Sequence, residues 1–246
     1  MRWYTGAEGD RRLWLEPDEI EAIMEDKLRD AKLVPSVEQP VTDLECLVEI
    51  HLGSPLDQHA YLPADVLGLT EFRSGRPPVV SINRDLTGSA LDEEDSPLGL
   101  RGRWRATLAH EASHVILHRV LFEVDGQESL FPEEVTFSGG AMMRCLKRDV
   151  GYGRRANADW REVQANRGMA ALLMPRRVFH RVTRRELADI GISRSALKAG
   201  DPKLTHLVRR LAERFEVSRQ AASIRLSTLR YVEASGTLPV PPAATP

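Results

Sequence analysis

The chain is 246 residues long, which is enough to bury a substantial hydrophobic core in one large domain or in one domain with a small appendage. Hydrophobic residues make up 42% and charged residues 28% of the sequence, and no stretch approaches the roughly 18 apolar residues of a membrane span, so we expect a soluble cytoplasmic protein without a signal peptide. The net charge of −2 excludes an extreme overall charge, and the two cysteines, Cys46 and Cys145, form no CxxC pair, which argues against a disulfide framework and a cysteine-only metal site.

Two helices are predicted in the first quarter of the chain, after an N-terminal extension of residues 1–16. Apolar residues recur at three- and four-residue steps from residue 17 to 33, behind an acidic first turn, which is the pattern of an amphipathic helix. Two prolines end this helix. Thr42 can then cap a second helix, which Gly53 ends.

A small β-sheet is predicted between residues 57 and 83, where short β-branched and aromatic segments alternate with Gly and Pro. The segment VVSIN, residues 79–83, is a candidate edge strand, on which an extended peptide substrate could pair through its backbone. A buried structural strand fits this segment equally well. The acidic stretch from residue 90 to 99 follows as a surface loop.

Helical patterning returns at residues 103–119 and again at 159–173, where Pro175 stops it. Between these helices, residues 121–158 show no sustained period. We therefore expect a long loop that holds one short helix at about residues 141–147.

Two further helices are predicted at residues 203–215 and 218–232. A tight turn at Glu216 and Val217 separates them, and Ser218 is the expected N-cap of the second helix. The uncharged tail that follows contains four prolines, so we expect it to be extended and mobile.

One of the predicted helices carries the strongest chemical signal, the sequence His110-Glu111-Ala112-Ser113-His114. Residues four apart lie on the same face of a helix, so both imidazoles can bind one metal ion while Glu111 lies beside them. Two imidazoles and a carboxylate suit the tetrahedral preference of zinc and leave a fourth position for water. The alternative is a helix that exposes two histidines and a glutamate without binding a metal; we favour the metal site.

A catalytic zinc site needs a third protein ligand, and the best candidate is Glu162. It lies 52 residues after His110, near the start of the next well-patterned helix, from which it would complete a His2Glu site. A solvent-facing glutamate paired with an arginine is the alternative. His118 continues the four-residue step, but it lies about 12 Å from His110 along the helix axis, so we expect a supporting or packing role for it.

The segment HEASHVILH, followed by EVQANRGMAALLMP, resembles the ImmA/IrrE family of metallopeptidases. The pattern of that family is HExxH and then ExxAN, with a small-residue helix that ends in LLMP. The resemblance extends more loosely over most of residues 17–232. It implies one zinc ion per chain, with His110, His114 and Glu162 as ligands, and a catalytic role for Glu111.

The resemblance also implies a fold and a substrate. The expected fold is an α+β metallopeptidase of the zincin type, with a small β-sheet packed on the HExxH helix and a helix-turn-helix-like helical part at the C-terminus. The implied activity is regulated cleavage of a helix-turn-helix transcriptional repressor in a stress or mobile-element response. The expected organisation is an N-terminal extension at 1–16, a zinc metallopeptidase domain at 17–200, a helix-turn-helix-like subdomain at 201–233 and a Pro-rich tail at 234–246.

Two features depart from the family pattern. Gly168 stands where the family usually has an aromatic residue, and the loop between the two motifs is longer than usual. This loop carries Cys145 and Tyr152. We interpret Cys145 as an inert, partly buried thiol rather than as a redox switch at the zinc.

The chemistry expected of this site assigns Glu111 the role of general base. Zinc lowers the pKa of a bound water towards 7, and Glu111 is placed to take a proton from this water and pass it to the leaving amine. Asp159 and Asn166 flank Glu162 and could orient the ligands, although helix capping and packing explain them equally well. The sequence does not choose among four possible donors to the tetrahedral intermediate, which are Tyr61, Arg101, His118 and Tyr152.

Two other functions stay open on the sequence. Residues 154–246 carry 18 Lys/Arg and 8 Asp/Glu, a net charge of +10, against −12 for residues 1–153; a DNA-binding regulator would use Arg219, Gln220 and Arg225 in a groove. We favour the simpler interpretation, in which the two parts neutralise each other and the last helices serve packing. A metal-bound sensor without turnover is the other possibility, but a purely structural zinc site needs no general base. The sequence predicts no particular oligomeric state.

Overall fold

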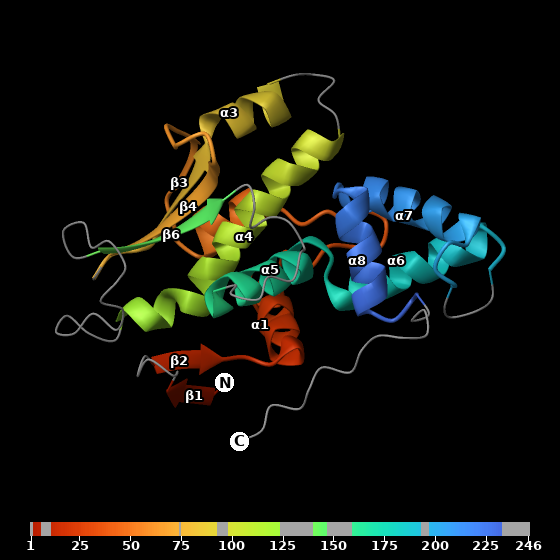
Figure 1. The fold of residues 1–246 in the computed structure, drawn as a ribbon, viewed down its shortest axis with the longest axis horizontal. Helices are drawn as coiled ribbons and strands as arrows, with labels where there is room; N and C mark the ends of the chain where they lie inside the picture. Colours follow the sequence, from red (N-terminus) through yellow and green to blue (C-terminus); the bar gives the residue numbers. More distant parts are fainter. Residues whose placement is uncertain are drawn as a thin grey trace.

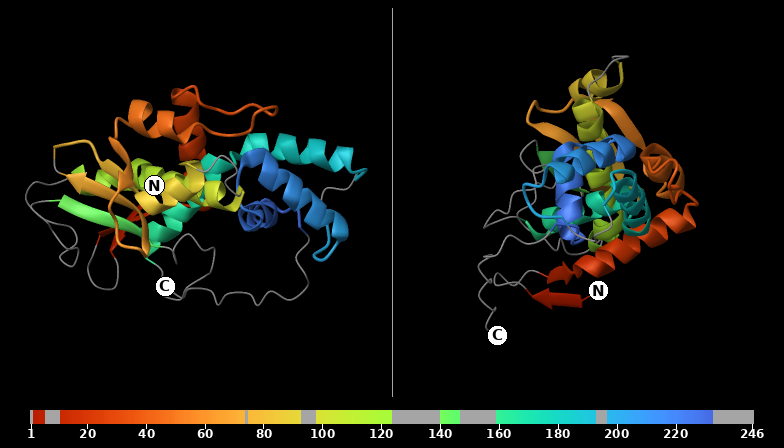
Figure 2. Two further views of the ribbon diagram at one scale, coloured as in Figure 1. Left: turned by 90° about the horizontal axis from the view of Figure 1, so that it is seen from above. Right: turned by 90° about the vertical axis from the view of Figure 1, so that its right-hand side faces the viewer.

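The computed structural model describes residues 2–5, 11–73, 75–92, 98–123, 140–146, 159–192 and 197–232. In this part of the chain, a four-stranded sheet lies on one side of a central pair of helices, and three C-terminal helices lie at the other end of the molecule (Figures 1 and 2). This is the α+β arrangement that the sequence predicts. No helix in these ranges is both long enough and apolar enough to cross a membrane.

The N-terminal segment packs onto the body of the molecule. β1 (Arg2–Thr5) and β2 (Arg11–Trp14) form an antiparallel hairpin, which leads into α1 (Pro17–Asp30). Leu13 and Leu15 are buried in the hydrophobic core. α1 confirms the predicted amphipathic helix: it starts with a proline and an acidic first turn, and it buries Ile20, Met24 and Leu28.

The second predicted helix begins one residue later than expected, because Asp43 and not Thr42 caps it. The Asp43 carboxylate accepts the backbone N–H of Cys46 at 2.9 Å, whereas the buried Thr42 hydroxyl donates to the carbonyl oxygen of Leu172 at 2.7 Å. The helix is short and continues as a π-helical turn. Short helical turns occur here and after the sheet: α2 (Leu44–Cys46), η1 (Leu47–His51), α3 (Arg84–Thr87) and η2 (Gly88–Asp92).

The main sheet has the strand order β3-β5-β4-β6. β3 (Leu56–Ala60) is parallel to β5 (Val79–Asn83), and β4 (Val66–Arg73) is antiparallel to both β5 and β6 (Gly140–Leu146). Of the two interpretations of residues 79–83, the edge strand is wrong, because β3 pairs with the side that would have been free, and the buried structural strand is confirmed. β3 and β6 are the edges among the described strands of this sheet.

β6 also corrects the short helix predicted at residues 141–147. The strand pairs with β4 along its length, from Gly140 opposite Arg73 to Leu146 opposite Val66. Hydrogen bonds to a distant strand outweigh the local preference of such a short segment. Tyr152, the side chain of Cys145 and the tail at 234–246 lie outside the described residues.

Two helices, α4 (Leu98–Glu123) and α5 (Trp160–Leu173), cross at the centre of the molecule (Figure 1). α4 packs against β4, and α5 packs against α1. The crossing is close at Gly168, where an added Cβ would lie only 2.7 Å from the Ser113 hydroxyl oxygen. A larger side chain at this position would push α4 and α5 apart, so the glycine allows the two helices to bring their polar residues together.

The C-terminal part consists of α6 (Arg176–Asp189), α7 (Pro202–Phe215) and α8 (Arg219–Thr228). α7 and α8 confirm the predicted helix pair. Glu216 makes the turn in a left-handed conformation with φ 51°, and the Ser218 hydroxyl caps α8 by accepting the third following backbone N–H at 3.1 Å. α8 packs through its buried residues Ala221, Ala222, Arg225 and Leu226.

Candidate metal centre

The crossing of α4 and α5 brings together the three side chains that the sequence nominated as metal ligands. His110 and His114 lie one turn apart on α4 and are fully buried, and Glu162 faces them from the first turn of α5. One carboxylate oxygen of Glu162 lies 3.0 Å from Nε2 of His110, and the other lies 3.3 Å from Nε2 of His114. The two Nε2 atoms are 3.0 Å apart.

These three groups suit a divalent metal ion. Each offers one ligand atom, and the three atoms lie within 4.8 Å of one another. Two imidazoles and a carboxylate form the donor set of catalytic zinc sites, which leave a position open for water or substrate. In the described part of the chain, no other group of three or more His, Cys, Asp or Glu side chains has this arrangement.

The electrostatics of the three groups favour an ionised carboxylate between two imidazoles. Burial opposes ionisation of Glu162, but the neighbouring His114 and His110 outweigh burial and lower its pKa well below its usual value. Burial lowers the pKa of His114. Burial also acts against the protonation of His110, but the hydrogen bond and charge of Glu162 outweigh it and raise the pKa of His110. Glu162 therefore presents an anionic oxygen to each ring.

Further polar side chains hold the outer edges of both imidazoles. Nδ1 of His110 lies 3.2 Å from Oδ1 of Asn166, as the sequence allowed. Nδ1 of His114 lies 2.9 Å from Nδ1 of His118, which confirms a supporting position for that residue. Asp159 acts differently: it caps α5 by accepting the N–H of Arg161 at 2.9 Å.

Glu111 lies beside the candidate metal ligands, with its two carboxylate oxygens in different environments. Oε2 accepts a hydrogen bond from the hydroxyl of Thr70 on β4, whereas Oε1 is buried without a partner among the described residues. Burial raises the pKa of Glu111 to about 8, although His110 and Thr70 act in the opposite direction. One oxygen is thus fixed by Thr70, and the other keeps its hydrogen-bonding capacity within the described part of the chain.

Gly68 and Thr70 belong to the candidate site, and the sequence analysis missed both. An added Cβ at Gly68 would lie 2.7 Å from Oε1 of Glu111, so only glycine lets β4 approach the carboxylate this closely. Both residues lie on one face of β4, two positions apart, and about 40 residues before the motif. The period-two spacing of a strand is the only sequence signal that joins them.

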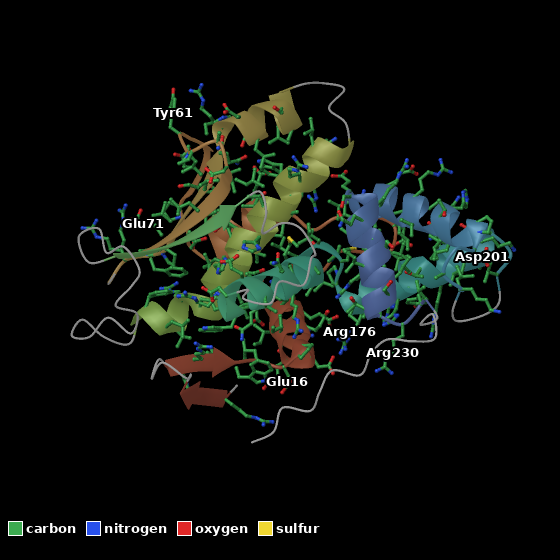
Figure 3. The ribbon with its side chains drawn as sticks, viewed as in Figure 1. Glu16, Tyr61, Glu71, Arg176, Asp201 and Arg230 are labelled. Carbon is green, nitrogen blue, oxygen red and sulfur yellow. The ribbon has the colours of Figure 1, made fainter. Side chains whose placement is uncertain are left out.

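The structure tests three of the four possible donors to the tetrahedral intermediate. Tyr61 is 85% exposed at the outer end of the sheet, where the guanidinium of Arg84 lies over its ring (Figure 3). Arg101 is exposed near the start of α4. His118 engages both ring nitrogens, with His114 and with Gln164. None of these three is placed to donate at the metal ligands, and Tyr152 lies outside the described residues.

Comparison with known proteins identifies the region that contains the site. A peptidase family model, described as the IrrE N-terminal-like domain, matches residues 101–227. The match runs from the first turns of α4 to the end of α8, so it contains His110, Glu111, His114 and Glu162 and also the C-terminal helices. No curated protein matches the chain.

Proposed function

Because the chain belongs to the IrrE N-terminal-like peptidase family, we propose that it is a zinc-dependent endopeptidase, with His110, His114 and Glu162 as metal ligands and Glu111 as general base. The observation that carries the proposal is the buried carboxylate of Glu111, one oxygen of which has no partner among the described residues and lies beside a His2Glu donor set. A structural metal site would not need such a group.

The residues of the site divide the reaction between them. When zinc is bound, it supplies a Lewis acid that activates water and polarises the carbonyl group of the substrate. Glu111 accepts a proton from the attacking water through Oε1 while Thr70 holds Oε2 in place. The water oxygen bonds to the carbonyl carbon, the carbon–nitrogen bond breaks, and Glu111 returns the proton to the leaving amine.

We propose that the substrate binds as an extended peptide along β6. Among the described strands β6 is an edge of the sheet, and it pairs with β4, the strand that contacts Glu111 through Thr70. Backbone pairing at an edge gives affinity without demanding a particular sequence. This edge takes the role that the sequence analysis considered for residues 79–83.

The proposed substrate class is a helix-turn-helix transcriptional repressor in the cytoplasm. Its support is the resemblance of HEASHVILH and EVQANRGMAALLMP to the ImmA/IrrE family, whose members control stress responses and mobile elements in this way. Regulated cleavage of a repressor would couple proteolysis to transcription. A sensor that binds metal without turnover is a weaker proposal, because it gives no role to Glu111.

A comparison of three proteins tests the proposed function: the unmodified chain, Glu111→Gln, and Glu213→Gln as a control on the exposed face of α7. Each is assayed for zinc content and for cleavage of helix-turn-helix repressors from the same genome. We expect about one zinc ion per chain in all three and cleavage that falls by about 10² to 10⁴ only in Glu111→Gln. Cleavage that survives this substitution would refute Glu111 as general base.

A further inference from the structure

The outer edge of His114 is held by a chain of hydrogen bonds that ends in the N-terminal hairpin. It runs from His114 through His118 and Gln164 to the backbone of Leu13 on β2. All four residues are buried: the two histidines and Leu13 have no exposed surface, and Gln164 is 4% exposed. Bulk water therefore has no contact with the two histidines or with Leu13, and almost none with Gln164.

The direction of this chain is set at Leu13. Its carbonyl oxygen can only accept a hydrogen bond, and it receives one from Nε2 of Gln164 at 2.8 Å. This contact fixes the orientation of the Gln164 amide, so that its oxygen points to His118. The amide oxygen lies 3.1 Å from Nε2 of His118 and can only accept, so Nε2 of His118 carries the proton.

The position of the proton on His118 determines the position of the proton on His114. A neutral His118 with its proton on Nε2 has a bare Nδ1, which accepts a hydrogen bond from Nδ1 of His114 at 2.9 Å. The proton of His114 is therefore on Nδ1, and its Nε2 is bare. That bare nitrogen is the atom that faces Glu162 at 3.3 Å.

Packing against Trp160 holds the ring of His118, which lies in the middle of the hydrogen-bonded series. The ring of Trp160, at the start of α5, meets the ring of His118 edge-on, with 5.8 Å between the ring centroids. Trp160 and Gln164 lie one turn apart on the same face of α5, so one helix both packs against the ring of His118 and accepts its hydrogen bond.

The two imidazoles of the donor set are thus oriented in different ways. His110 is held directly by Asn166, within the region that the family model matches. His114 is held through a relay that ends at Leu13, well before residue 101, where the match begins. The hairpin strand β2 is consequently linked to the metal ligands by three consecutive hydrogen bonds.

We infer that His118 and Gln164 are positioning residues, which with the Leu13 carbonyl hold His114 in the tautomer that presents Nε2 to a metal ion. The inference rests on the proposed function in one respect, since it requires a metal at this site. It adds a role for the N-terminal hairpin, whose backbone terminates the relay.

The relay can be tested without any substrate. Nitrogen-15 NMR of histidine-labelled, metal-free protein reports which ring nitrogen of each histidine carries the proton. We expect the Nδ1–H form for His114 and the Nε2–H form for His118 in the unmodified chain. The opposite tautomer at either ring would overturn the inference, whether or not the protein binds zinc.

Zinc affinity, measured by competition with a chromophoric chelator, gives a second test. His118→Phe and Gln164→Leu should each weaken zinc binding by about 10- to 100-fold, as losses of such supporting hydrogen bonds do. Thr42→Val is the matched control, because it removes a buried hydrogen bond to the other end of α5 and touches no metal ligand. We expect it to change zinc affinity by less than about twofold; thermal unfolding verifies that each variant is folded.

The outcomes separate the relay from the proposed function. If the unmodified chain binds no zinc, the proposed function is wrong, and the tautomer measurement still tests the hydrogen-bond chain. If the unmodified chain binds zinc and both folded variants bind it equally well, the relay has no positioning role although the metal site stands.

Discussion

The candidate metal centre and the C-terminal helix pair α7–α8 both contain buried polar residues that could be functional. The partners of these residues differ between the two regions. At the metal centre, buried side chains converge, and one carboxylate oxygen of Glu111 has no partner among the described residues. In the helix pair, the buried polar residue is Arg225, and its guanidinium is fully engaged: it pairs with Glu21 and donates to the carbonyl oxygen of Met174. Buried ionisable groups that converge beside an unpartnered carboxylate oxygen point to chemistry, whereas a buried guanidinium with a partner on each nitrogen points to packing.

Ion pairs between the basic C-terminal part and the acidic N-terminal part account for the uneven charge of the chain. The basic C-terminal half places several arginines against the acidic helix α1 and the segment after it, and Figure 3 shows Arg176 at this junction. Arg225 is only 2% exposed, so it cannot reach a DNA groove in this fold, whereas Arg219 and Gln220 stay exposed. Ion pairs join the two halves at Arg176–Asp18, Arg177–Glu25, Arg185–Glu38 and Arg225–Glu21.

The largest effect is expected from a histidine substitution at the metal centre. His110→Ala removes one of three ligands and should weaken zinc binding by at least about 10³-fold and abolish cleavage, since metal binding depends on the full donor set. His206→Ala makes the same change in α7 and should alter neither property. Chelator competition measures the zinc affinity and a cleavage assay measures the activity. Equal zinc affinity in the two variants would show that His110 is no more a ligand than His206.

The next largest effect should appear in stability, at Arg225. Arg225→Met leaves the carboxylate of Glu21 and the carbonyl of Met174 without their buried partner and should lower the free energy of unfolding by about 3–5 kcal/mol. Arg219→Ala, on the exposed side of the same helix, should change it by less than about 0.5 kcal/mol. Urea denaturation measures these changes. If Arg225→Met kept full stability but weakened binding to a duplex, the helix pair would be a DNA reader.

A smaller effect on turnover is expected at Gly68. Gly68→Ala places a methyl group against Oε1 of Glu111 and the side chain of Thr107, so it should displace the general base and lower kcat by about 10- to 100-fold. Zinc affinity should stay within about threefold, because no ligand is touched. Gly99→Ala, whose added Cβ meets nothing within 4 Å, is the control. Unchanged kcat in Gly68→Ala would show that the position of Glu111 tolerates this displacement.

The smallest effect is expected at the N-cap of α8. Ser218→Ala removes the hydroxyl that accepts a backbone N–H and should lower the free energy of unfolding by about 1 kcal/mol without changing zinc affinity or kcat. Ser227→Ala, near the exposed end of the same helix, should change the free energy of unfolding by a few tenths of a kcal/mol. An effect of Ser218→Ala on turnover would connect the helix pair to the metal centre.

The sequence predicts the metal centre better than its surroundings. His110, His114 and Glu162 follow from helical spacing and from a second patterned helix, because a helix converts local sequence into geometry. Helical spacing could not identify three other residues of the site. Tertiary packing brings Thr70 and Leu13 to the site from distant strands, and Gln164 is one polar residue on a buried helix face.

The two errors in the sheet have the same origin. Residues 79–83 were considered for an edge strand or, equally, a buried strand, and a helix was expected at about residues 141–147, but strand order and pairing are decided by partners far away in the chain. β6 forms because β4 offers it a free side, and β5 is internal because β3 covers it. Local patterns could not reveal either partner.

The central claim is that one metal ion binds where α4 and α5 cross. Crystals of the zinc-loaded protein, measured on both sides of the zinc absorption edge, locate the ion directly by its anomalous scattering. We predict one peak at about 2.0–2.2 Å from Nε2 of His110, Nε2 of His114 and the carboxylate of Glu162. A peak elsewhere, or no peak in protein that was saturated with zinc, would contradict the claim.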